Sequence, residues 1–184
     1  MENDTHIYVH EFPVGIAKTV NFAHERHRHD FFSVDFILEG ECQQYINGKA
    51  YMCTPGTICL LSPLDDHYYV NKNPDTKIVF LTFSDDVMLP LVSETLNTTL
   101  APYITTFTPE DTKILCEEFS MLECEMQSKS PLRTALIQAM VNKLLIKIIR
   151  AASDAPSVPA RKSDNMHNAI SYRKATINPD HVTE

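Results

Sequence analysis

Long uninterrupted apolar runs are missing from this sequence of 184 residues. No stretch reaches the roughly eighteen apolar residues of a membrane-spanning helix. The polar start, MENDTH, lacks the basic and then apolar pattern of a signal peptide. We therefore expect a cytoplasmic protein with no membrane partner. The hydrophobic content of 43% is enough for the core of one ordinary domain.

Cysteines at the spacing of a metal knuckle or a disulfide framework are missing too. The sequence has an odd set without a CxxC pair: Cys42, Cys53, Cys59, Cys116 and Cys124. Zinc sites and small secreted scaffolds need closer or even-numbered sets. We interpret these residues mostly as buried free thiols.

An excess of basic residues is also absent. Sixteen Lys and Arg residues stand against twenty-four Asp and Glu residues, which gives a formal net charge of −8 without any long single-sign run. Such a chain repels the phosphate backbone of a nucleic acid. We expect that these 184 residues do not bind duplex DNA by themselves.

What the sequence does contain, from Thr19 to Ser84, is a series of short β-favouring runs separated by turn residues. This pattern is typical of a β-sandwich or a β-barrel. The expected strands are Phe31 to Leu38, Glu41 to Ile46, Lys49 to Met52, Thr57 to Leu61, His67 to Val70 and Lys77 to Phe83. Asn47-Gly48 suits the positive φ angles of a two-residue hairpin turn between the second and third of these strands.

Two helices are expected after the strands. The first begins at Thr108-Pro109-Glu110-Asp111, which supplies a cap, a proline at the first helical position and acids at the positive end of the dipole. Its apolar stripe is Leu115, Phe119, Leu122 and Met126. The second helix, Leu132 to about Arg150, is apolar on more than one face, so we expect it to have two partners. For a second copy of the chain, the expected contacts are Ile137, Met140, Val141, Leu144 and Ile148.

Four histidines, His24, His27, His29 and His67, stand near the expected strand ends. On a regular extended strand alternate side chains share a face. One face then carries His27, His29, Phe31, Ser33, Asp35 and Ile37, and the other carries Phe32, Val34, Phe36 and Leu38. The pattern predicts a barrel interior on one side and a second packed element on the other. Asp35 is the exception, an acid on an inward face, unless a bulge turns it outward.

Several short motifs carry a family resemblance. They are His27-Arg28-His29-Asp30-Phe31-Phe32, Leu38-Glu39-Gly40-Glu41, Ile46-Asn47-Gly48-Lys49, Pro55-Gly56-Thr57 and the segment from Pro63 to His67. In order and spacing, over roughly Ala23 to Ser84, they resemble the cupin-like sensor domain of AraC/XylS-type bacterial transcription regulators. Leu81 to Asp86 and the two helices are similar to the barrel exit and the dimerisation helices of that family. Met166 to Tyr172, with Asn178 to Thr183, is similar to the segment that opens its helix-turn-helix domain.

The resemblance implies a mainly β fold with α elements. It is a cupin-like double-stranded β-helix, or jelly-roll barrel, followed by two antiparallel helices. The implied domains are a ligand-binding barrel (1–105), a helical dimerisation region (106–152), a linker rich in Pro, Ser and Ala (153–164) and the truncated start of a DNA-binding domain (165–184). The implied function is to bind a small organic effector and so control DNA binding by a C-terminal domain. The implied partners are the effector, a second copy of the chain and, through that domain only, DNA.

We expect the effector to contact His27, His29, Phe31, Ser33, Asp35, Tyr45, His67 and Tyr69, with Ile37 as part of the wall. The family resemblance points first to a sugar or a related metabolite, and the family also senses aromatic and fatty acids. Since tryptophan is absent, a sugar has to stack on Phe or Tyr.

This sequence departs from the pattern of metal-binding cupins at one position. In those proteins a glutamate follows the HxH pair, and here Ser33 stands in its place. We therefore expect no cofactor, no bound metal and no enzyme activity. The alternative is a mononuclear metal-dependent oxygenase or isomerase that uses His27, His29 and His67, since imidazole sites suit iron, zinc or nickel. A third possibility is a barrel that has lost its effector and serves only to dimerise, with the histidines as polar rim residues.

Overall fold

The computed structural model describes residues 14–20, 25–71, 75–99 and 102–153. Its elements are β1 (Val14–Val20), β2 (Phe32–Glu39), β3 (Cys42–Ile46), β4 (Lys49–Cys53), β5 (Thr57–Leu61), β6 (His67–Asn71), β7 (Lys77–Phe83), the 3-10 turn η1 (Asp85–Val87), α1 (Pro90–Thr99), β8 (Tyr103–Thr106), α2 (Pro109–Gln127) and α3 (Arg133–Ser153). His24, the linker and the expected start of a DNA-binding domain lie outside the described residues.

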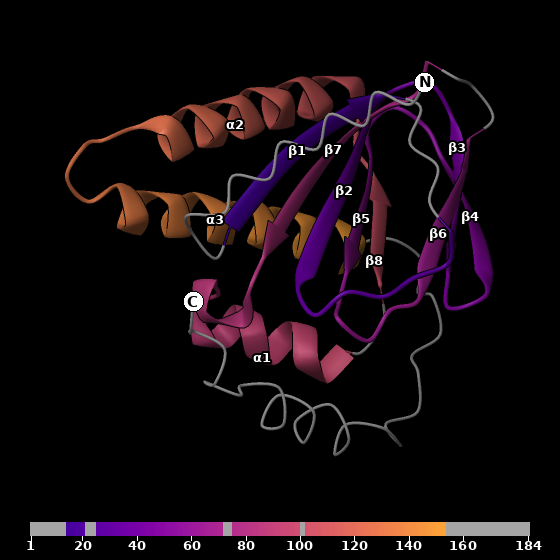
Figure 1. The fold of residues 1–184 in the computed structure, drawn as a ribbon, viewed down its shortest axis with the longest axis horizontal. Coiled ribbons are helices and arrows are strands. Elements are labelled where there is room, and N and C mark those ends of the chain that lie inside the picture. Colours follow the sequence, from indigo (N-terminus) through magenta and orange to yellow (C-terminus); the bar gives the residue numbers. More distant parts are fainter. Residues whose placement is uncertain (1–13, 21–24, 72–74, 100–101, 154–184) are drawn as a thin grey trace, which may run out of the picture.

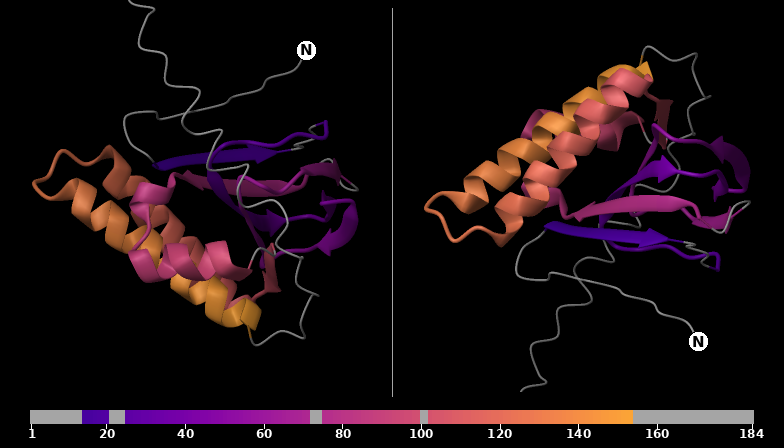
Figure 2. Two further views of the ribbon diagram at one scale, coloured as in Figure 1. Left: turned by 90° about the horizontal axis from the view of Figure 1, so that it is seen from below. Right: turned by 90° about the horizontal axis from the view of Figure 1, so that it is seen from above.

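The strands form two antiparallel sheets that face each other. One has the order β1-β7-β2-β5-β8, and the other has the order β4-β3-β6. Side chains from both sheets share one buried cluster, which includes Ile37 and Ile78 of the first sheet and Ile46 and Tyr69 of the second. Figures 1 and 2 show α2 and α3 lying side by side against the larger sheet, away from the smaller one. The predicted barrel followed by two antiparallel helices is therefore confirmed.

The alternation along β2 follows the sequence. Phe32, Val34 and Phe36 are buried in the cluster that joins the larger sheet to the helices, and the ring of Phe36 stacks on that of Phe119 with centroids 5.3 Å apart. Asp35 faces the other sheet and is 1% exposed. The register shift of this strand lies between Ile37 and Glu39, beyond Asp35, so no bulge turns the acid outward.

Two turns depend on left-handed backbone, and the first of them is the predicted one. Asn47 and Gly48 join β3 to β4 with φ values of 53° and 78°, as a two-residue hairpin turn requires. Gly56, between β4 and β5, has a φ of 90°, and a Cβ there would lie 2.9 Å from the carbonyl oxygen of Phe107. Glycine is required at this position both by the φ value and by the close approach of another segment.

Helix α2 begins and packs as the sequence predicts. The hydroxyl of Thr108 accepts a hydrogen bond from the backbone N–H of Asp111 at 3.1 Å, and Pro109 opens the helix. The predicted stripe of Leu115, Phe119, Leu122 and Met126 is buried. This face therefore attaches α2 to the barrel.

Helix α3 packs differently from the expectation. Ile137, Val141, Leu144 and Ile148 are each at most 1% exposed, and Met140 is half-buried. These four buried side chains belong to the core between the sheet and the helices, so the expectation that they contact a second copy is wrong. The broad apolar arc is covered within the chain, because α3 packs on α2 and also on β8, η1 and α1. Two large apolar side chains in this part of the chain are exposed to solvent. They are Leu132, directly before α3, at 82% exposure and Leu136, in the first turn of α3, at 48% exposure.

The connection between the barrel and α2 contains α1 and β8, which have no strong sequence signal. Asn142 of α3 holds this connection. Its side-chain oxygen accepts from the N–H of Leu89 at 2.7 Å, and its amide donates to the carbonyl of Val87 at 2.9 Å. Among the helices of the described ranges, none is long and apolar enough to cross a membrane.

Candidate functional site

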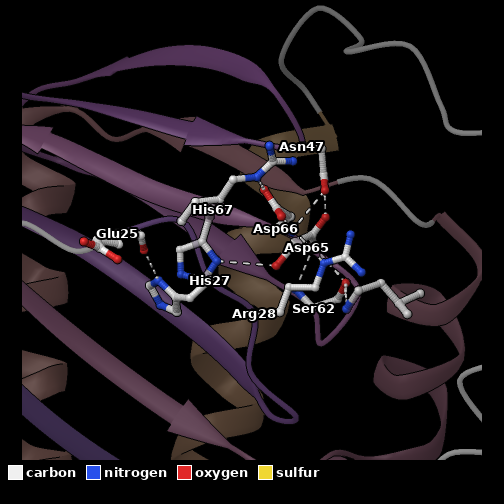
Figure 3. Close-up of polar contacts among 10 residues, drawn as sticks. Glu25, His27, Arg28, Asn47, Ser62, Asp65, Asp66 and His67 are labelled. Atoms are coloured by element: carbon white, nitrogen blue, oxygen red, sulfur yellow. Dashed lines mark hydrogen bonds and ion pairs between the residues drawn. The ribbon is translucent and has the colours of Figure 1, made fainter.

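Three imidazole rings meet where the segment before β2 passes the start of β6. The backbones of His27 and His67 exchange two hydrogen bonds of 3.0 Å each. The ring centroid of His67 lies 4.4 Å from that of His27 and 5.0 Å from that of His29, and the latter two centroids are 6.2 Å apart. His27 and His29 are half-buried, whereas His67 is 4% exposed. Figure 3 shows His27 and His67 side by side.

Backbone carbonyl groups orient these rings. The Nδ1 atoms of His27 and His29 lie 2.8 Å and 2.7 Å from the carbonyl oxygens of Glu25 and Phe31. Because a carbonyl oxygen only accepts, the proton of a neutral ring belongs on Nδ1, and Nε2 is then the acceptor nitrogen. The ring of His29, when neutral, can therefore accept a hydrogen bond from a ligand hydroxyl at Nε2.

Two of the rings are held in the uncharged form at neutral pH. Burial, followed by the charge of His27, lowers the pKa of His67 to about 4. Burial, followed by the charge of His67, also lowers the pKa of His29. Crowded, partly desolvated imidazoles disfavour protonation because each added charge loses water and repels its neighbour.

Behind the histidines, the barrel interior holds a buried carboxyl group. Asp35 accepts hydrogen bonds from the hydroxyl of Ser33 and the amide of Gln44, both at 3.0 Å, and from the hydroxyl of Tyr69. Burial raises the pKa of Asp35, and the three donors oppose that rise. Three strands, β2, β3 and β6, thus position one satisfied polar cluster inside the barrel.

Seven of the eight expected site residues belong to this region. His27, His29 and His67 meet at one end of the barrel, and Ser33, Asp35 and Tyr69 lie together inside it. Phe31 stacks on His29, with ring centroids 4.2 Å apart and planes 6° from parallel. Gln44 was missed, although it alternates with Cys42 and Ile46 on one face of β3, and this period of two is the signal for it.

Tyr45 is the expected site residue that lies elsewhere. It sits on the outer face of the smaller sheet, because its neighbour Gln44 faces inward. Its ring stacks on Tyr68 with centroids 4.5 Å apart, and its hydroxyl donates to the Gln43 side chain at 3.2 Å. The assignment of Tyr45 to the barrel interior is therefore wrong.

A polar network fixes the backbone around the histidines, as Figure 3 shows. The carboxylate of Asp65 accepts from the Asn47 side chain at 2.5 Å and from both the N–H and the hydroxyl of Ser62 at 2.8 Å. Asp66 pairs with Arg26 at 2.6 Å and with Arg28 at 3.8 Å. The guanidinium groups of Arg26 and Arg28, which flank His27 in the sequence, are thus paired with a carboxylate.

The arrangement does not fit a metal ion. Across the ranges that the structure describes, no three His, Cys, Asp or Glu side chains are placed to hold one. Ser33, at the position of the cupin glutamate, instead donates to Asp35. Nothing in the geometry of these described residues therefore favours the three-histidine enzyme alternative.

The sequence matches the AraC-like ligand binding domain family over residues 13–170. The chain belongs to this family. Among solved structures, an apo variant of ToxT from Vibrio cholerae superposes with a TM-score of 0.58 at 12% identity, covering 91% of this chain and 66% of that one. The AraC-like transcriptional activator CuxR gives a TM-score of 0.58 at 14% identity, covering 95% of this chain and 64% of that one. The chain spans about two thirds of the length of both regulators.

No curated protein sequence matches the chain. The family match identifies it as the effector-binding domain of an AraC-type transcription regulator. The two structural likenesses, at low identity, establish that its fold is that of such regulators. The predicted family, its cupin-like barrel and its ligand-binding role are confirmed.

Proposed function

We propose that this AraC-like domain binds a neutral, hydroxyl-rich small molecule, such as a sugar, at the histidine end of the barrel. The observation that carries the proposal is the convergence of His27, His29 and His67 in front of the buried cluster around Asp35. A site of this kind, with few polar groups of fixed orientation and an aromatic wall, is typical of small-molecule recognition. The domain acts by binding, and no chemical step is required of it.

The charges near the histidines favour an uncharged effector. His29 and His67 are neutral at neutral pH, because their pKa values are lowered. The guanidinium groups of Arg26 and Arg28 pair with Asp66, so they are not the partners that a ligand carboxylate would need. Asp35, inside the barrel, would repel an anion whenever it is ionised. Hydroxyl groups can donate to imidazole nitrogens, and the ring of Phe31 offers an apolar face for stacking.

The test compares neutral sugars with the corresponding sugar acids in thermal unfolding. A neutral ligand at about a hundred times its dissociation constant should stabilise the protein by about 2.7 kcal/mol. The substitution His29→Gln should reduce this effect, and Tyr45→Phe, on the outer face, is the matched control. Stronger stabilisation by the sugar acids, or an equal loss in Tyr45→Phe, would contradict the proposal.

Binding would act on the rest of the regulator through the larger sheet. An effector shifts an equilibrium only by its different affinity for two arrangements. β2 carries Asp35 on the ligand side and Phe36, stacked on Phe119 of α2, on the opposite side. A small movement of this strand would therefore reach the helices directly, and from them the DNA-binding domain of the whole protein.

We infer in addition that two copies of the chain pair through the outer face of α3. Leu132 and Leu136 expose large apolar surfaces, and half-buried Met140 follows one turn later. A contiguous apolar patch on an otherwise polar helix surface is typical of an interface. AraC-type regulators carry dimerisation helices at this place, which favours a second copy as the occupant.

A further inference from the structure

Three cysteines meet inside the barrel at the end away from the histidines. Cys42, Cys53 and Cys59 are each 0% exposed. Cys42 and Cys53 are direct partners across β3 and β4 of the smaller sheet. Cys59 belongs to β5 of the larger sheet, and its sulfur lies 3.9 Å from that of Cys53. The contact between Cys53 and Cys59 therefore joins the two sheets.

These thiols touch the polar cluster of the candidate effector site. The sulfur of Cys53 lies 3.9 Å from the side-chain oxygen of Gln44, whose amide donates to Asp35 at 3.0 Å. Hydrogen bonds from Cys42 and then Cys59 lower the pKa of Cys53. Cys53 is also the central thiol of the group, since it lies opposite Cys42 across β3 and β4 and contacts Cys59 of the other sheet. This position, together with the lowered pKa, favours Cys53 as the nucleophile.

We propose that Cys53 and Cys59 are a peroxide-oxidisable pair that closes a disulfide between the two sheets. The thiolate of Cys53 attacks one oxygen of hydrogen peroxide and the O–O bond breaks. The S–O bond of a sulfenic acid forms on Cys53, and the other oxygen of the peroxide leaves as hydroxide. Cys59 then attacks the Cys53 sulfur, the S–O bond breaks, and water leaves as the S–S bond forms. The two thiols lose two electrons and two protons, and one peroxide becomes two waters.

The geometry favours this pair. The sulfurs must approach from 3.9 Å to about 2.05 Å, and the two residues flank one turn, Thr54–Gly56. Hydrogen peroxide is small and uncharged, so local opening of the barrel end admits it, whereas bulky disulfide reagents are excluded. Oxidation itself does not depend on the proposed effector. Its consequence, loss of the thiol contact to Gln44, is a change at the proposed effector site.

Peptide mapping of the full chain tests the proposal. Trypsin places Cys53 and Cys59 alone on residues 50–72, Cys42 on residues 29–49, and Cys116 with Cys124 on residues 114–129. After peroxide treatment, alkylation and digestion, peptide 50–72 should be two hydrogens lighter and unlabelled, and its reduced form should fall by about tenfold. Dithiothreitol should restore it. A peptide 50–72 that stays fully alkylated, or one cross-linked to peptide 29–49, would overturn the proposal.

Two variants separate the steps. In Cys59→Ala the Cys53 sulfenic acid has no neighbouring Cys59, so dimedone should label peptide 50–72. In the matched variant Cys42→Ala the same disulfide should still be the end product, although it should form more slowly because the hydrogen bond from Cys42 that lowers the pKa of Cys53 is lost. Equal dimedone labelling of wild type and Cys59→Ala would contradict the pairing. Because the mapping is done on the wild type, poor folding of either variant does not alter its result.

Discussion

The two faces of β2 differ in what they bury. Phe32, Val34 and Phe36 bury apolar surface against the helices. On the other face, Ser33 and Asp35 bury polar groups that need partners from two other strands. Apolar burial stabilises a fold directly, whereas a buried polar network at best offsets its own loss of hydration. Apolar clusters are buried on both sides of the larger sheet, but the buried carboxyl group and its donors lie only on the barrel side, which is where we place the binding function.

The largest expected effect tests the helix side. Leu144→Glu puts a charge into the core, where the Leu144 side chain is 1% exposed. We expect a loss of roughly 5 kcal/mol in the free energy of unfolding, enough to unfold most domains. Urea denaturation followed by circular dichroism measures it. A folded variant of near wild-type stability would mean that α3 does not pack on the barrel.

A smaller loss is expected from the sheet itself. Phe36→Ala removes a fully buried ring that stacks on Phe119, so the free energy of unfolding should fall by about 3–5 kcal/mol. Phe31→Ala, on the opposite side of the strand and half-buried, should lose less stability but weaken ligand binding. If the two variants lose equal stability, the division between the faces is not real.

The pH dependence of stability tests the barrel side, because His67 titrates there with a shifted pKa. The pKa of His67 is about 4 in the folded protein, against an ordinary value of 6.5 for an unfolded chain, so the unfolded chain binds more protons between these values. Stability from this group is complete above pH 6.5 and falls by up to about 3 kcal/mol as the pH drops towards 4. Asp35, with its raised pKa, acts in the opposite direction. The comparison of wild type with His67→Asn cancels the Asp35 contribution, and a parallel pH profile in both proteins would contradict the assignment.

Two identical substitutions compare the faces of the smaller sheet. Tyr69→Phe removes a donor to buried Asp35 and should lower the free energy of unfolding by about 1–3 kcal/mol. Tyr45→Phe keeps the stacked ring on the outer face and should change it by less than about 0.5 kcal/mol. Thermal unfolding of both variants measures the difference. The reverse order would place Tyr45, not Tyr69, in the barrel.

The smallest effect on stability is expected at Leu136, which is 48% exposed. Leu136→Glu should stay within about 0.5 kcal/mol of wild type, because the new charge remains in water. It should nevertheless shift the mass measured by light scattering from dimer to monomer. A wild type that is monomeric at the concentrations measured, or a variant that stays dimeric, removes the outer face of α3 as the interface.

Local signals predicted most of the elements. Some features depend only on residues close together in the sequence, so the sequence predicts them. They are the strand alternation, the Asn47-Gly48 turn and the Thr108 cap. β8 was not predicted, because its four half-buried or exposed residues form a strand only by pairing with β5. Helix α1 likewise has a weak pattern and depends on Asn142, which is far away in the sequence.

The site was predictable in part. Period-two alternation placed Asp35 inside the barrel, and the same rule applied to β3 puts Gln44 inside and Tyr45 outside. For β3, however, the sequence does not say which alternate set of side chains faces inward, because a tyrosine such as Tyr45 is as compatible with an interior as with a surface. The pairing of β3 with β6 fixes the register and so decides it.

The sequence by itself determined the family, the six barrel strands from β2 to β7 and the two long helices, because these follow from local patterns and ordered motifs. The tertiary structure decided which apolar face of α3 is covered by its own chain, and which side chains meet inside the barrel. Burial of Leu144 and the contact of Cys53 with Cys59 both depend on elements from different sheets or helices packing together. Such contacts have no period along the chain, since they arise only when distant segments compete for the same buried space.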